Sequence, residues 1–135
     1  MGCEVVTVST DKKFSHLAWR TVEGQLADVN FQMAADPTAA VSKQFGIYLE
    51  GAGVALRGTY LISPEGVLMN SEVNFLNVGR NVDEMMRKFK ANLYVAKKSG
   101  EAVPAQWKEE GDTTLTPSAK MVGKVQEALA NGGKI

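Results

Sequence analysis

The sequence predicts a single α/β domain, and three observations indicate this fold class. Short runs of β-branched and apolar residues alternate with segments whose apolar residues recur at helical spacing. The order strand, helix, strand, helix, then a hairpin and a further helix is typical of α/β architecture. The 135 residues are 44% hydrophobic and 22% charged, as in an ordinary globular domain.

The first three elements follow from hydrophobic pattern alone. The β-branched run at 5–8 predicts a buried strand that ends in a turn-prone Ser-Thr-Asp sequence. A second short apolar run at 31–35 predicts another strand. Between them we expect a helix from about Lys12 to Gly24, because four apolar residues recur there at helical spacing: Phe14, Leu17, Ala18 and Val22.

The second helix is predicted from its end signals. Asp36 suits an N-cap and Pro37 the first helical position. Gly46 suits the residue after the helix. The residues expected to face inward are Ala40, Val41 and Phe45.

A hairpin is expected next. The strand-like segment 56–62 and the segment 67–73 flank Ser63-Pro64-Glu65-Gly66, which carries proline and glycine where turns favour them. The earlier Gly51-Ala52-Gly53 predicts a turn and not a phosphate loop, because no Lys-Ser/Thr pair follows it.

The strongest helical pattern covers 82–98. Asn81 can cap this helix, and acidic residues in its first turn favour the helix dipole. One stripe at helical spacing predicts a core face: Val82, Met85, Met86, Phe89 and Leu93.

After this helix the composition changes. Residues 99–116 are polar, with Pro104 and Gly111 as breakers, so we expect an arm and not core. Thr116-Pro117 then predicts the start of a last amphipathic helix. That helix would carry Met121, Val122, Val125 and Leu129.

Charge and cysteine content exclude several function classes. Fifteen basic residues balance fifteen acidic ones without a basic stripe, which argues against a nucleic-acid or anionic-membrane partner. No apolar stretch reaches membrane-spanning length, and the start lacks the basic and apolar regions of a secretory signal. Cys3 is the only cysteine, so no internal disulfide can form, and a reducing cytoplasm is the expected compartment.

Five segments, in order and covering nearly the whole chain, resemble the alkyl hydroperoxide reductase C/thiol-specific antioxidant family of typical two-cysteine peroxiredoxins. They are VSTDKKFSHLAW (8–19), ADPTAAVSKQFGIY (35–48), ALRGTYLISPEGVL (55–68), VGRNVDEMMRKFKANLYV (78–95) and GEAVPAQWKEEGDTTLTPS (100–118). One such motif is a weak signal, whereas five in register are a specific one.

The resemblance implies a thioredoxin-like (peroxiredoxin) fold that is incomplete at the N-terminus. Residues 1–98 would be the C-terminal portion of the core, and 99–135 the C-terminal arm and helix. The implied activity is reduction of hydrogen peroxide and organic hydroperoxides, with a thioredoxin-like or flavin-dependent disulfide reductase as partner. No cofactor or metal is implied.

Two departures from the family pattern concern cysteine. The loop with the peroxidatic cysteine would lie upstream of Met1, so this chain has no peroxidatic cysteine. Val103 occupies the position of the resolving cysteine and cannot form a disulfide. Either an enzyme with this arm works in one-cysteine fashion, or Val103 is an engineered replacement of the cysteine.

Arg57 is the first candidate site residue, because the family arginine at this position orients the peroxide and the thiolate. A guanidinium suits both tasks, since it stays charged and offers several fixed donors. Arg80 is a second family position near the pocket. Cys3 and His16 are expected to be structural, because no basic neighbour activates the thiol and a single histidine forms no metal cluster.

The resemblance also implies a homodimer through the edge strand 67–74, and a ring of five dimers. The other hypotheses are a truncated, non-catalytic subunit that dimerises through that strand, and a one-cysteine redox protein that uses Cys3. The family strand that leads to the peroxidatic loop is central. We therefore expect residues 1–135 alone not to form a stable native monomer, because buried edges and a helix face would be uncovered.

Overall fold

The computed structural model describes residues 2–135 as two compact units. One unit comprises the residues up to Thr59 together with Glu72–Gly79, and the other comprises Tyr60–Ser71 and Arg80–Ile135. The β5–β6 hairpin contributes residues to both. Among the described residues no helix combines the length and the apolar character needed to cross a bilayer.

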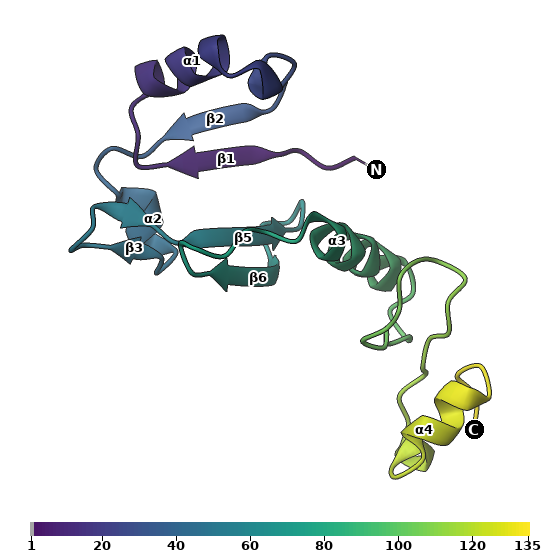
Figure 1. Ribbon diagram of the computed structural model, residues 1–135. Helices are drawn as coiled ribbons and strands as arrows, with labels where there is room; N and C mark the ends of the chain where they lie inside the picture. The colour runs from purple at the N-terminus through teal and green to yellow at the C-terminus, as the bar shows by residue number, and fades with distance from the viewer. Residues whose placement is uncertain (1) are drawn as a thin grey trace. The chain divides into compact units, whose positions relative to one another are not determined.

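The first unit begins with a parallel strand pair. β1 (Val6–Ser9) pairs with β2 (Gln32–Ala35), with Val6 opposite Gln32. The connection runs through α1 (Lys13–Val22), which packs beside β2 (Figure 1), and a short 3-10 turn at Gly24–Leu26. The predicted positions of both strands and of the helix are confirmed.

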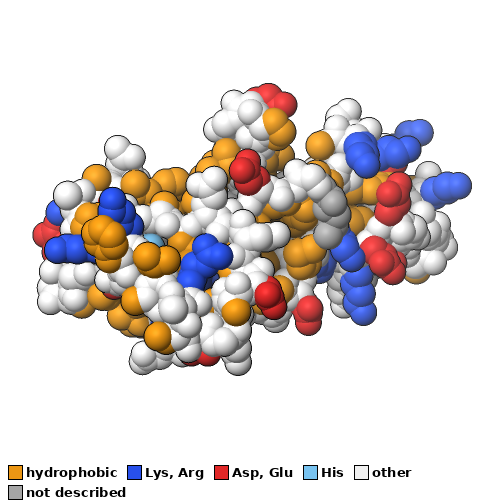
Figure 2. Space-filling model, turned by 90° about the horizontal axis from the view of Figure 1, so that it is seen from above, with side chains coloured by type: hydrophobic (Ala, Val, Ile, Leu, Met, Phe, Trp, Pro, Cys, Tyr) orange, Lys and Arg blue, Asp and Glu red, His pale blue; other side chains and the backbone are white. Residues whose placement is uncertain are grey.

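The predicted burial of these elements is wrong. Val6 and Val8 of β1 are 55% and 45% exposed, because the β1–β2 sheet has only two strands in residues 2–135. Phe14, Leu17 and Val22 of α1 are 70%, 62% and 80% exposed. Figure 2 shows hydrophobic side chains at several places on the surface. The described chain therefore presents apolar area that soluble monomers ordinarily cover.

This exposed apolar surface gives a first testable prediction. We expect the isolated 135-residue chain to associate or to melt without a cooperative transition, because its apolar helix and strand faces lack cover. Light scattering after size exclusion, combined with thermal melting by circular dichroism, checks this expectation. A sharp cooperative transition from a monomer would contradict it.

The second helix is shorter than predicted. α2 (Ala40–Gln44) starts three residues after Pro37, and Ala39 occupies the N-cap with a left-handed φ of 56°. Asp36 still serves this end, because its carboxylate accepts from the Ser42 N–H at 2.8 Å, the Ser42 hydroxyl at 2.8 Å and the Val41 N–H at 3.2 Å. The backbone bond from Ser42 is the largest influence that lowers the pKa of Asp36.

The inward face predicted for α2 is also wrong. Ala39 and Ser42 are buried, at 3% and 4% exposure, whereas three expected core residues are exposed: Ala40, Val41 and Phe45. The one turn of helix that forms buries only Ser42 and leaves Val41 and Phe45 without cover in the described residues. The expected stop is confirmed, since Gly46 follows the helix with a φ of +66° that favours glycine.

Two hairpins follow α2. The first joins β3 (Tyr48–Leu49) to β4 (Val54–Ala55) through the predicted glycine turn, and its two-residue strands were not predicted. The second joins β5 (Arg57–Ile62) to β6 (Leu68–Asn74), as predicted. Its turn closes with the Ser63 N–H donating to the Val67 carbonyl at 2.8 Å.

The long helix α3 (Val82–Lys97) has the predicted cap. The Asn81 side chain accepts from the Glu84 N–H at 3.0 Å. The predicted core stripe is wrong, because no residue of α3 is buried, and Val82 is 64% exposed.

The predicted polar arm contains core. Trp107 is 2% exposed, and Ala102 forms an antiparallel bridge with Leu115. The predicted last helix is two pieces, a 3-10 turn at Ala119–Met121 and α4 (Val125–Ala130). Gly123, with a φ of +77°, separates them.

Candidate functional site

Arg57 is the first residue of β5, and its side chain is exposed. Its Nε donates to the backbone carbonyl of Leu76 at 3.2 Å. In residues 2–135 neither Nη of Arg57 has a hydrogen-bond partner. The guanidinium is thus anchored at one nitrogen and presents its other donors to solvent, which suits recognition of an oxygen-rich or anionic group.

Arg80, the second candidate, lies immediately before the N-cap Asn81 of α3 and is exposed. It belongs to the other compact unit from Arg57. Its role beside Arg57 therefore stays a prediction.

Cys3 and His16 lie in different surroundings, the first exposed and the second buried. Cys3 is an exposed free thiol whose Sγ lies 3.6 Å from the carbonyl oxygen of Glu4. His16 is 7% exposed, and its Nε2 lies 2.7 Å from the hydroxyl of Ser9, which also bonds the carboxylate of Asp11 at 2.9 Å. The described residues contain no group of three or more His, Cys, Asp or Glu side chains that could hold a metal ion.

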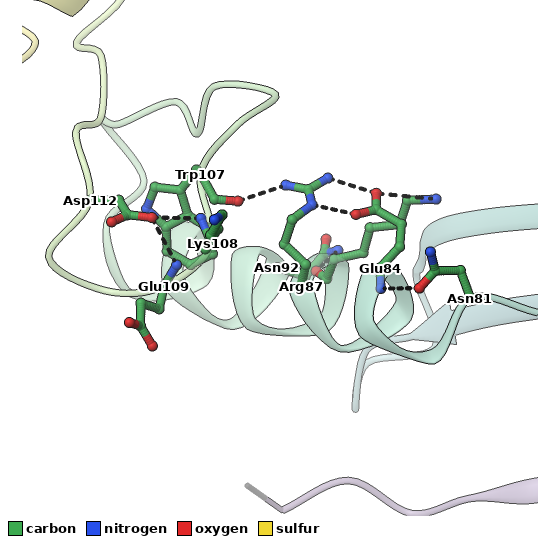
Figure 3. A network of polar contacts seen from close by, with 9 residues as sticks. Asn81, Glu84, Arg87, Asn92, Trp107, Lys108, Glu109 and Asp112 are labelled. Carbon is green, nitrogen blue, oxygen red and sulfur yellow. Dashed lines mark hydrogen bonds and ion pairs between the residues drawn. The ribbon is translucent and has the colours of Figure 1, made fainter.

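The segment that carries Val103 is docked on α3, and Figure 3 shows part of its polar contacts. Arg87 forms a two-point contact with Glu84, with N–O distances of 2.6 and 2.9 Å, and donates to the carbonyl of Trp107 at 3.1 Å. The Trp107 and Tyr94 ring centroids lie 5.5 Å apart. Half-buried Val103 follows the bridge residue Ala102. The arm position implied for the resolving cysteine is therefore held in a folded loop.

Glu101 closes the base of this loop. Its Oε2 accepts from the Thr114 hydroxyl and the Tyr94 hydroxyl, each at 2.6 Å. The Thr114 bond, followed by the Tyr94 bond, lowers the pKa of Glu101 below its ordinary value of 4.5. The same contact raises the pKa of Tyr94.

The Glu101 contacts predict acid sensitivity of the docked arm. Because the pKa is lower in the folded state, the carboxylate stabilises that state fully above the unfolded pKa, and this contribution is lost as pH falls below about 4.5. Trp107 fluorescence followed through an acid titration checks this. Glu101→Gln should flatten the change below pH 4.5, whereas the matched change at exposed Glu109 should not. Identical titrations for both variants would contradict the prediction.

Comparison with known proteins supplies the remaining observation. The sequence model of the AhpC/TSA family matches residues 1–71. The model of the C-terminal domain of 1-Cys peroxiredoxin matches residues 93–131. The chain belongs to the AhpC/TSA family. This confirms the resemblance inferred from the five sequence segments.

Similar proteins of this family are named alkyl hydroperoxide reductase C. The one from Pseudomonas aeruginosa is 42% identical over 92% of this chain, and the one from Escherichia coli K12 is 40% identical over 93%. The chain spans 66% of the length of each of these relatives.

Solved structures agree with the family assignment. The reduced 2-Cys peroxiredoxin of Plasmodium vivax superposes with a TM-score of 0.78 at 29% identity, covering 90% of this chain and 65% of that one. AhpC of Enterococcus faecalis superposes with a TM-score of 0.72 at 34% identity, and the match covers 76% of this chain and 61% of that one. The predicted peroxiredoxin fold class is confirmed.

The sequence analysis did not predict the contacts that hold Arg57 and the arm in place. The three-residue spacing of Glu84 and Arg87 on a helix could have indicated their ion pair. The bond from Arg57 to the Leu76 carbonyl joins residues 19 apart and has no sequence signal. The Thr114–Glu101 bond likewise depends on the path of the loop.

Proposed function

We propose that this chain is part of a thiol peroxidase that reduces hydrogen peroxide and organic hydroperoxides. A cysteine thiolate outside residues 1–135 attacks one peroxide oxygen, the O–O bond breaks, and the leaving alkoxide or hydroxide takes a proton. The cysteine is oxidised to sulfenic acid and the peroxide is reduced to alcohol or water. A first thiol of a disulfide reductase partner attacks the sulfenic acid, releasing water and forming a mixed disulfide. A second thiol of that partner then displaces the cysteine as its thiol, and the partner is left as the disulfide.

The observation that carries this proposal is Arg57 in a chain of the AhpC/TSA family. Its Nε is held by a backbone carbonyl, and its Nη donors remain available for a peroxide oxygen and a thiolate. A fixed positive charge at this position would stabilise the thiolate and the negative charge that develops on the leaving oxygen. Arg80 is proposed as a supporting residue.

The arm supports a one-cysteine cycle. Valine at position 103 cannot resolve a sulfenic acid, and the docked loop gives this segment a structural role. The match of residues 93–131 to the C-terminal domain of 1-Cys peroxiredoxin fits this interpretation. The Plasmodium vivax structure that the chain resembles is that of a 2-Cys peroxiredoxin. We accordingly propose a core portion at 1–98 and an arm with its helix at 99–135.

We also propose a homodimer through strand β6, with assembly into a decameric ring, in the cytoplasm. The sheet of β5 and β6 ends at β6 in the described residues. Three apolar side chains of β6 are 42% to 54% exposed: Leu68, Met69 and Val73. An exposed sheet edge of this kind is a template for antiparallel pairing with a second copy.

Peroxide consumption by the natural protein, combined with its intact mass, tests the proposal. We expect activity, a mass that includes residues beyond 1–135, and no change in rate on Cys3→Ser, because within residues 2–135 the polar contact of the Cys3 thiol is with the carbonyl of Glu4 and not with a basic group. Loss of activity in Cys3→Ser would instead assign the chemistry to Cys3. An inactive protein of the mass of residues 1–135 would support the non-catalytic subunit that pairs through β6.

A further inference from the structure

The loop after β6 is closed by two hydrogen bonds. The Val78 N–H donates to the Phe75 carbonyl at 2.9 Å, which makes a four-residue turn. The Asn74 side chain donates from Nδ2 to the Gly79 carbonyl at 3.2 Å and so ties the end of β6 to the far side of that turn. The loop is thus held by one backbone hydrogen bond and by one hydrogen bond from the Asn74 side chain.

The carbonyl that anchors Arg57 lies inside this closed loop. Leu76 is the second residue of this turn. The bond that closes the turn joins Phe75 and Val78, so it does not use the carbonyl of Leu76. Its carbonyl accepts instead from Nε of Arg57 at 3.2 Å. Asn74 holds the conformation of the loop, and this conformation sets the direction of the Leu76 carbonyl. The direction of that carbonyl in turn sets the plane of the Arg57 guanidinium.

We propose that Asn74 is a positioning residue for Arg57, acting through the Leu76 carbonyl. This inference rests on the proposed role of Arg57 in hydroperoxide reduction. A guanidinium directs its Nη donors in one plane with Nε, so a rotated Nε bond turns every other donor away. Such misplacement lowers rate without unfolding the protein.

Asn74→Asp is the sharpest variant, because it keeps shape and removes the Nδ2 donor. Asn70→Asp is the matched control: Asn70 lies four residues earlier on the same face of β6, is also half-buried and has no side-chain hydrogen bond in the described structure. In the natural protein we expect Asn74→Asp to lower kcat/KM for hydrogen peroxide about tenfold. Asn70→Asp should leave it unchanged, and Asn74→Gln should recover part of the loss.

A double-variant comparison separates positioning from a general structural role. If Asn74 acts through Arg57, Asn74→Asp has no further effect on kcat/KM once Arg57 is alanine. The second measurement is the exchange of the Arg57 Nε–H with water by nitrogen-15 NMR, which should be slow in the wild type and fast in Asn74→Asp.

Each outcome decides a different question. Additive losses in the double variant, or an unchanged Nε–H exchange rate in Asn74→Asp, would overturn the positioning role and leave the proposed peroxidase intact. Full activity in Arg57→Ala would refute the role of Arg57 instead. If the protein consumes no peroxide, the NMR measurement alone judges whether Asn74 holds the guanidinium.

Discussion

Replacing Arg57 by alanine should lower kcat/KM for hydroperoxide by about a hundred- to a thousandfold in the natural protein. Removing one preorganised donor to developing oxyanion charge costs about 3–4 kcal/mol in enzymes of other classes. Arg57 would also act on the thiolate before attack. Stopped-flow measurement of peroxide reduction at several pH values checks the expectation, and the pH profile should shift upward as the thiolate loses its cationic neighbour.

Two comparison variants make this result specific. Arg57→Lys keeps the charge but loses the planar donor fork, so we expect an intermediate rate. Arg20→Ala removes a guanidinium that also donates to a backbone carbonyl, that of Val29, in the same compact unit. It should leave the rate unchanged. Equal losses in Arg57→Ala and Arg20→Ala would show a general effect of charge and would contradict the proposed role.

The second large effect is expected for stability. Trp107→Ala removes a large side chain that is 2% exposed and packs 5.5 Å from the Tyr94 ring. Aromatic truncation at a buried position costs about 3–5 kcal/mol, through lost transfer free energy and the cavity that remains. Urea unfolding of the natural protein, followed by circular dichroism, measures the change in the free energy of unfolding.

The chain provides controls for this prediction as well. Trp19 is 52% exposed, so Trp19→Ala should cost much less. Trp107→Phe keeps a ring against Tyr94 and gives up no hydrogen bond, because the indole Nε1 is buried without a partner in residues 2–135. It should therefore lie between wild type and alanine. Equal destabilisation by the alanine changes at Trp19 and Trp107 would contradict the packing described for the arm.

Local signals predicted the elements well. The Ser63-Pro64-Glu65-Gly66 turn set the hairpin, and Asn81 set the start of α3, since both depend on neighbours within a few residues. Burial was predicted poorly, because Phe14 and Leu17 have apolar character but little cover in the described chain. Hydrophobic spacing identifies which face of an element could be buried, and it does not supply the surface that buries it.

By itself, the sequence determined the family, the order of strands and helices, the absence of cysteine at position 103 and the choice of Arg57 as the candidate group. The tertiary structure alone decided what anchors that group and where the arm lies. The Leu76 carbonyl reaches Arg57 only after β5 and β6 pair, and Trp107 is buried only after its loop folds onto α3. Contacts between distant residues depend on the path of the whole chain, whereas caps, turns and motifs are properties of short segments.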